Sequence, residues 1–143
     1  MAKKQLFMFL FLLIILVAFS GCATSLQSYQ PKSSEEVRIK ELLLKWENTY
    51  NNHDVAGNLA TWNDKAQMMY GSERKIASKK EYANILPERM KAIPSLNLGT
   101  PDIKISGDKA QVSTVLSVRG TQTPAVINLI KENDTWSIMS FKY

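Results

Sequence analysis

The chain begins with a long apolar run that differs in pattern from everything after it. Fourteen apolar residues, Leu6 to Phe19, follow Lys3 and Lys4 without interruption. As a helix this run would rise about 21 Å, which is short of the roughly 30 Å hydrocarbon core of a bilayer. A basic start, an apolar centre and small residues at the end are typical of a secretory signal peptide. The pattern therefore predicts a leader that is cleaved.

After the leader, apolar residues first recur at intervals of three and four, which predicts helices. The first helix is expected over 33–52, where Ser33 and Glu36 have the spacing of a capping box. Asp54 is placed to cap a short second helix over 55–62. The apolar face of the first helix carries Ile39, Leu42, Leu43, Trp46 and Tyr50.

A third helix is expected after the second capping-box pair, Ser78 and Glu81. Pro87 lies inside this segment and predicts a kink or a break, because proline lacks the N–H that the helix needs. Pro94 marks the end of the helix. Its apolar face carries Tyr82, Ile85, Leu86, Met90 and Ile93.

From Ser95 onward the apolar period changes to two, which predicts strands. These later strands are expected at 96–105, 110–119, 125–132 and 135–143. One earlier strand is expected at 66–70, with Asn63-Asp64 as a turn before it. Along 110–119, one face carries Ala110, Val112, Thr114, Leu116 and Val118, and the other carries Gln111, Ser113, Val115, Ser117 and Arg119. One face therefore meets a core, and the other meets water or a partner. Helices followed by an antiparallel meander predict an α+β fold with the helices packed on one face of the sheet.

The leader ends in Phe19-Ser20-Gly21-Cys22, which resembles the lipobox of bacterial lipoproteins. Ser20 and Gly21 are small, as that motif requires, whereas Phe19 stands where leucine is commonest. The resemblance implies that the thiol of Cys22 receives a diacylglycerol and that the leader is cut before it. It also implies acylation of the new amino terminus with a fatty acid such as palmitate. An uncleaved N-terminal anchor is the alternative.

These signals divide the chain into a signal peptide (1–21), a lipidated cysteine with a flexible tether (22–34) and one folded domain (35–143). Cleavage leaves 122 residues, enough for a single core, and lowers the formal net charge from +5 to +3. So mild a charge does not indicate nucleic acid binding. The lipobox places the protein in the bacterial cell envelope. Ala23 after the cysteine implies, for a Gram-negative cell, the periplasmic side of the outer membrane.

Several short motifs of the domain stand in a recognisable order: Tyr50-Asn51-Asn52-His53-Asp54, then Trp62, then Ser78-Lys79-Lys80-Glu81-Tyr82, then Gly107-Asp108-Lys109-Ala110-Gln111-Val112, and the final Trp136 to Tyr143. In this order they resemble the cone-shaped α+β superfamily of nuclear transport factor 2 (NTF2-like), SnoaL-type cyclases and ketosteroid isomerase. The resemblance covers about residues 35–143. It implies a curved antiparallel sheet around a conical pocket and dimers formed through the sheet. The fold hosts enzymes, ligand binders and interaction modules.

The best-known chemistry of that superfamily is not predicted. By the resemblance, the two proton-transfer positions of the steroid isomerases fall on Trp46 and Tyr70. Tryptophan has no acidic hydroxyl, and a tyrosine with a pKa near 10 is a poor base at neutral pH. His53 is the only histidine and Cys22 the only cysteine, so a zinc site with three or four ligands is not predicted. We expect no catalytic residue, no metal and no cofactor.

The candidates for a small apolar ligand pocket are Trp46, Tyr50, His53, Asp54, Trp62, Tyr70, Tyr82 and Met90. Aromatic side chains with a few polar tips are typical of such sites, and they are equally typical of a core. We predict a non-enzymatic NTF2-like domain that binds a ligand or another protein.

Two alternatives stay open. The first is a SnoaL-like enzyme, of isomerase, cyclase or hydrolase type, that acts on a small apolar molecule through His53, Asp54 or a pocket tyrosine. An ionisable side chain inside an open cavity would favour it. The second is a homodimer that buries Gln111, Ser113, Val115 and Ser117 of the outer sheet face between subunits.

Overall fold

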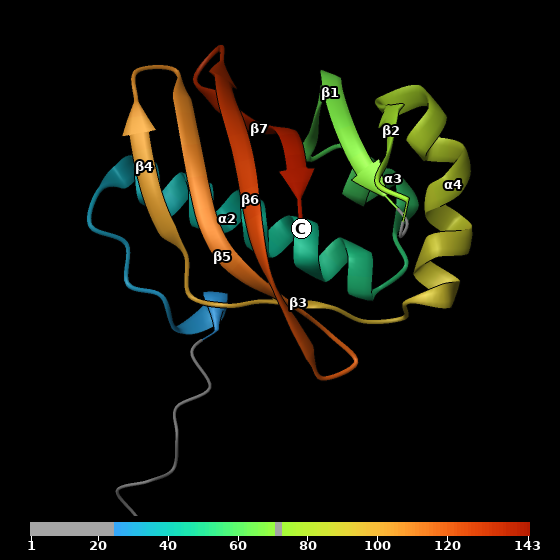
Figure 1. Cartoon of the computed structure of the whole chain (residues 1–143). Coiled ribbons are helices and arrows are strands. Elements are labelled where there is room, and N and C mark those ends of the chain that lie inside the picture. Colours follow the sequence, from blue (N-terminus) through green and yellow to red (C-terminus); the bar gives the residue numbers. More distant parts are fainter. Residues whose placement is uncertain (1–24, 71–72) are drawn as a thin grey trace, which may run out of the picture.

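The computed structural model describes residues 25–70 and 73–143, so the predicted signal peptide and Cys22 lie outside the described residues. The elements, in chain order, are η1 (Leu26–Ser28), α2 (Ser34–Asn51), α3 (Val55–Leu59), β1 (Trp62–Tyr70), β2 (Lys75–Ser78), α4 (Lys79–Ala92), β3 (Asn97–Leu98), β4 (Asp102–Ser106), β5 (Lys109–Val118), β6 (Thr121–Glu132) and β7 (Thr135–Lys142). Figure 1 shows a strongly curved sheet with the helices on one side of it. The predicted α+β class is confirmed.

Side-chain caps set the starts of the three longer helices, as predicted. The Ser33 hydroxyl accepts from the N–H of Glu36 and begins α2, and the Asp54 carboxylate accepts from Gly57 and begins α3. Ser78 and Glu81 form the full reciprocal capping box of α4. Helix α4 runs through Pro87 without a break, since its buried side chains are held by packing on the core.

The strands form one sheet of seven, in the order β2-β1-β7-β6-β5-β3, with β4 also paired to β5. All neighbouring strands are antiparallel except β1 and β7, which are parallel. Register shifts occur in β1 between Trp62 and Gln67 and in β6 between Asn128 and Leu129. Such bulges bend strands and add twist, which helps the sheet curve around its helices.

Three details of the predicted strands were wrong. Asn63-Asp64 lies inside β1 and is not a turn. The predicted strand 96–105 is divided into β3 and β4, because Pro101 has no N–H to donate to a sheet ladder. Strand β2 (Lys75–Ser78) was missed, since a four-residue segment with exposed lysine, isoleucine and serine has too little pattern to be recognised.

The two faces of β5 are divided as the alternation predicts. Ala110, Val112, Thr114 and Leu116 are buried against the helices. Gln111, Ser113 and Val115 are exposed on the opposite face. Apolar side chains of α2, α4 and the inner sheet face together form one hydrophobic core. No helix among residues 25–70 and 73–143 has the length and apolar character to cross a membrane.

The segment before α2 differs from the predicted flexible tether, because its described part is packed on the domain. Ser25 bridges to Gly99, and Leu26 is only 1% exposed. The Tyr29 hydroxyl and the backbone N–H of Lys32 donate to the carboxylate of Glu36, at 2.6 and 2.7 Å. Glu36 therefore does not complete a capping box with Ser33. It fastens the preceding segment to α2 instead.

Glu36 gives a pH-dependent prediction. Its hydrogen bonds from Tyr29 and Lys32 lower the pKa of the carboxyl, so its stabilisation is present above the unfolded-state pKa of about 4.3 and is lost as the pH falls through the folded-state value. Glu36→Gln should lower the free energy of unfolding by about 2 kcal/mol at pH 7. Urea denaturation should show that difference shrinking below about pH 4.3.

The matched control is Glu41→Gln, an exposed position on the same helix, where a change within about 0.5 kcal/mol is expected. A Glu36→Gln effect that stays constant between pH 7 and pH 3 would contradict the clamp.

Candidate functional site

The space enclosed by α2, α4 and the inner sheet face is filled by aromatic side chains. Its walls include Trp46, Tyr50, Trp62, Tyr82 and Phe141, and the remaining cavity is only about 20 Å³. The Trp46 and Phe141 rings stack at 5.0 Å between centroids, and the Trp62 and Tyr82 rings lie 6.0 Å apart. One water needs about 10–15 Å³ of such space, so this cavity has room for about one water and for no larger ligand. The cone interior is therefore a packed core.

A larger hollow of about 170 Å³ lies at the mouth of the cone, where the C-terminal part of α4 faces the β5–β6 hairpin. Its walls are mostly apolar, with Arg89 from the helix and Tyr143 from the end of the chain as the strongest polar groups. The lining residues are Arg89, Ile93, Leu96, Leu116, Val118, Thr121, Thr123 and Tyr143. An apolar hollow with a few convergent polar groups is the usual form of a small-ligand site.

Arg89 is a half-buried cation in this wall. One guanidinium nitrogen donates to the Tyr143 hydroxyl at 2.5 Å, and the guanidinium carbon lies 5.5 Å from the centroid of the same ring. Among the described residues no carboxylate forms an ion pair with Arg89. Arginine stays protonated at any physiological pH, so the mouth of the cone carries a positive charge that its surroundings do not neutralise.

The polar groups deeper in the cone keep their protons. Burial raises the pKa of Tyr82 to about 12 and also raises the pKa of Tyr50, whose hydroxyl donates to the backbone oxygen of Arg89 at 3.3 Å. The indole N–H of Trp62 is buried and has no hydrogen-bond partner among the described residues. The Tyr50 hydroxyl proton is already donated, and the Trp62 N–H faces the packed interior. A ligand at the mouth therefore meets the guanidinium of Arg89 and the hydroxyl groups of Thr121, Thr123 and Tyr143.

The structure brings four of the predicted pocket residues together: Trp46, Tyr50, Trp62 and Tyr82 line the cone interior. Tyr70 lies beside them, with its ring 6.4 Å from that of Tyr82, and Met90 is buried in the core. His53 and Asp54 lie elsewhere.

His53 and Asp54 occupy the exposed turn between α2 and α3 and do not line the cone. His53 has a left-handed backbone (φ 56°), and its ring Nε2 lies 3.3 Å from the Pro94 oxygen. The Asp54 side chain is occupied in capping α3. Both side chains therefore stabilise the turn and its flanking segments.

Arg89 and Tyr143 were not predicted as site residues. The sequence did contain a signal for Arg89. Tyr82 and Leu86 precede it by seven and three residues, and Ile93 follows it by four, so all four residues lie on one face of the helix. A single cation within an apolar helix face is the feature that would have identified it. Tyr143 is brought to Arg89 by the parallel pairing of β7 with β1, which the sequence pattern did not predict.

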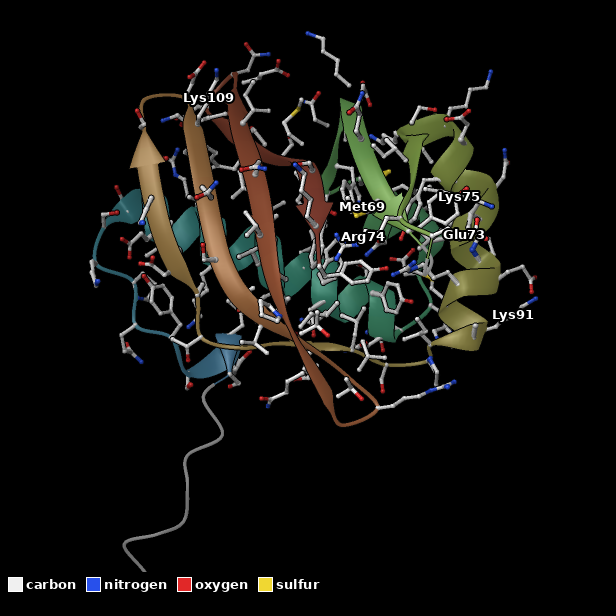
Figure 2. The ribbon with its side chains drawn as sticks, in the orientation of Figure 1. Met69, Glu73, Arg74, Lys75, Lys91 and Lys109 are labelled. Carbon is white, nitrogen blue, oxygen red and sulfur yellow. The ribbon has the colours of Figure 1, made fainter. Side chains whose placement is uncertain are left out.

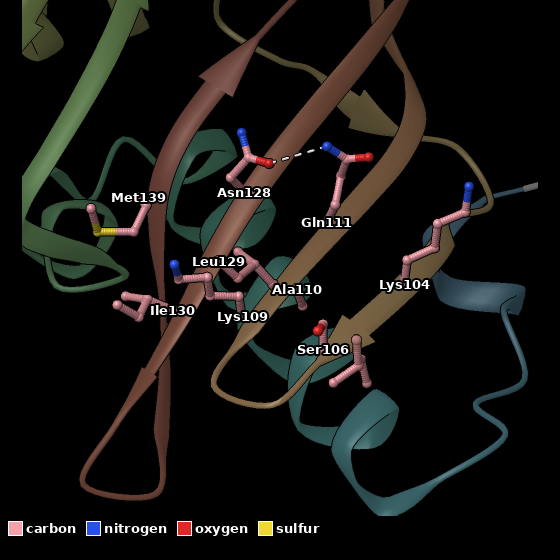
Figure 3. Close-up of a pocket in the computed structure, with 10 residues that line it drawn as sticks. Lys104, Ser106, Lys109, Ala110, Gln111, Asn128, Leu129, Ile130 and Met139 are labelled. Atoms are coloured by element: carbon pink, nitrogen blue, oxygen red, sulfur yellow. Dashed lines mark hydrogen bonds between the residues drawn. The ribbon is translucent and has the colours of Figure 1, made fainter.

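The outer sheet face carries a second, wider hollow of about 510 Å³ (Figure 3). It lies over β4, β5, β6 and β7 beside the Asn128 bulge. Gln111 donates to Asn128 at 3.4 Å, and Asn128 donates to Ser140 at 2.8 Å. Ile130 and Met139 supply an apolar floor, while Lys104 and Lys109 stand at its edge. This shallow surface offers shape and amide groups but no acid–base pair.

Solved structures with this architecture come from several bacteria. A cystatin-like-fold protein of unknown function from Nostoc punctiforme superposes with a TM-score of 0.66 at 18% identity, over 78% of this chain and 92% of that one. An NTF2-like protein of unknown function from Shewanella baltica superposes with a TM-score of 0.63 at 16% identity, over 78% of this chain and 94% of that one. An NTF2-like protein from Cytophaga hutchinsonii superposes with a TM-score of 0.65 at 14% identity, over 76% of this chain and 95% of that one.

The fold is NTF2-like. At these identities the likeness concerns the fold and not an activity. No protein-family model matches the chain, and no curated protein matches it either. The sequence-based expectation of an NTF2-like fold is therefore confirmed, and the function of the domain has to be argued from its own residues.

Arg89 gives a prediction about stability. A half-buried cation without a carboxylate partner costs desolvation free energy that its hydrogen bond only partly offsets. Arg89→Met should therefore leave the free energy of unfolding unchanged or raise it by up to about 2 kcal/mol, as measured by urea denaturation. Lys91→Met, at an exposed position two residues along α4, is the control. A loss of more than about 1 kcal/mol in Arg89→Met would mean that Arg89 is present for structural reasons.

Proposed function

We propose that this protein is a lipid-anchored component of the bacterial cell envelope whose NTF2-like domain is a non-enzymatic binding module. The observation that carries the binding role is the mouth of the cone, where Arg89 presents an unneutralised charge to a hollow of about 170 Å³. Ligand sites commonly retain such a group at a cost in stability. The lipobox-like sequence that ends in Cys22 supports the anchor.

The arrangement of ionisable groups favours binding over catalysis. A cyclase, isomerase or hydrolase needs a group near the substrate that exchanges a proton at neutral pH. The titratable side chains that line the cone interior and its mouth are tyrosines and Arg89. His53 and Asp54, the candidates of the enzyme alternative, stand on the outer turn. The pKa values of Tyr50 and Tyr82, raised by burial, make these hydroxyls poorer acids than ordinary tyrosines.

A second candidate function is self-association through the outer sheet face. The hollow of about 510 Å³ and the exposed side chain of Val115 favour it, since a shallow face that keeps its lysines at the edge can pack on its own copy. Native mass spectrometry of the mature protein in mild detergent would report dimers if this role is real. It would report monomers if the face only meets water.

The anchor gives a direct prediction. Cys22→Ser should abolish incorporation of an alkyne-labelled fatty acid and leave a full-length precursor, because serine offers no thiol for lipidation. Labelling in living cells followed by gel fluorescence and intact mass measures both results. Ser20→Ala, which keeps a small residue before the cysteine, should label as the unchanged protein does. Fatty-acid label on the Cys22→Ser protein would overturn the proposed anchor.

A further inference from the structure

The distance between the proposed lipid and the folded domain is very short. Ser25 is bridged to Gly99, whose N–H donates to the Val115 oxygen at 2.8 Å. Cys22 precedes Ser25 by only three residues. An extended chain spans at most about 3.5 Å per residue, so the link is limited to roughly 10 Å. A lipid on Cys22 would thus hold the β3 edge of the domain at the membrane surface.

The same edge carries the mouth of the cone. Strand β3 pairs with the end of β5 through Leu98 and Leu116, and Leu116 is itself part of the wall of the 170 Å³ hollow. In Figure 1 the blue start of the described chain, β3, the β5–β6 hairpin and the C-terminal end of α4 all lie at the lower edge. The short link and the hollow therefore face the bilayer together.

Positive charge gathers around this opening. Arg89 stands in its wall and Arg119 at the tip of the β5–β6 hairpin, whereas Lys91, near the lower end of α4 (Figure 2), is outside the wall and its charge is neutralised by an ion pair. Lys91 is paired with Glu88. Arg119 donates to the Ala92 backbone oxygen, and among the described residues no carboxylate pairs with it. Basic side chains held within a Debye length of a membrane are attracted to anionic lipids.

We propose that the mouth of the cone binds the anionic head group of a single-chain amphiphile from the membrane in which the protein is anchored, with Arg89 as the anion-binding residue. This inference rests on the proposed lipid anchor. The chemistry required of the ligand is an oxyanion, such as a carboxylate, on an apolar chain. Arg89 binds the oxyanion through its free N–H groups, and the hydroxyls of Thr121 and Thr123 provide further donors.

The size of the hollow decides which part of the amphiphile enters. A cavity of about 150 Å³ is enough to bind a benzene-sized molecule, so 170 Å³ has room for about six non-hydrogen atoms. This suffices for a head group and a few carbon atoms, which would contact Ile93, Leu96 and Val118. The rest of the chain stays in the bilayer, as the orientation of the mouth allows. A soluble anion lacks the apolar contacts and should bind far more weakly.

The test uses the full, lipidated protein reconstituted in neutral phosphatidylcholine vesicles. A fatty acid that carries bromine on the carbon next to its carboxylate is added, so that the bromine enters the mouth with the head group and quenches tryptophan fluorescence at short range. Trp46 and Trp62 line the cone interior, which shares Arg89, Leu96, Leu116 and Tyr143 with the mouth, and they report binding. We expect saturable quenching, and we expect Arg89→Met to raise the half-saturating concentration at least tenfold. Lys91→Met, the matched control on α4, should match the unchanged protein.

Thr123→Phe, which fills the mouth without altering its charge, should abolish the saturable component and serves as a second variant should Arg89→Met fold poorly. Acetate or inorganic phosphate at millimolar concentration should not displace the fatty acid. Equal quenching in all variants, or full displacement by a free anion, would overturn the inference. If Cys22 carries no lipid, the protein will not be retained on the vesicles. Failure of the proposed anchor is thereby distinguished from failure of the site.

Discussion

The carboxylate of Glu36 fixes the path by which the chain enters the folded domain. It accepts from the Tyr29 hydroxyl and the Lys32 N–H, and it thereby fastens residues 29–32 to α2. Lys40 strengthens the attachment by donating to the Gln27 and Tyr29 backbone oxygens. With Leu26 buried and Ser25 bridged to Gly99, the chain leaves the domain at one defined point. The proposed anchor, three residues earlier, would then fix the orientation of the domain as well as its location.

Packing in the cone complements this constraint. The stacked rings of Trp46 and Phe141 and the neighbouring tyrosines leave about 20 Å³ inside, so a ligand has room at the mouth and not in the depths. The polar groups that remain are tyrosine hydroxyls and the Trp62 N–H, near a guanidinium with which no described carboxylate forms an ion pair. Because such a lining suits negative charge and offers no group that exchanges a proton at neutral pH, we propose a binding role.

Local signals predicted much of this fold. Caps at Ser33, Asp54 and Ser78 placed the helices, and alternation along β5 placed its buried face. Features that depend on distant partners were missed: the parallel pairing of β1 with β7, and the clamp on residues 25–32, whose anchors are single residues without a period. The aromatic pocket residues were recognised by type. Arg89 was not, although it stands as a single cation on the apolar face of α4; only its contact with Tyr143 depends on distant partners.

The orientation of the domain at the membrane is tested most directly by measuring how far two hairpin tips lie from the bilayer. Fluorophores on Arg119→Cys, at the β5–β6 tip beside the mouth, and on Asn133→Cys, at the β6–β7 tip, would be exposed in turn to quenchers attached to lipid head groups. The two tips lie at opposite edges of the domain (Figure 1). Strong quenching at position 119 and little at position 133 is predicted. Equal quenching, or the reverse order, would contradict a domain held with its mouth toward the membrane.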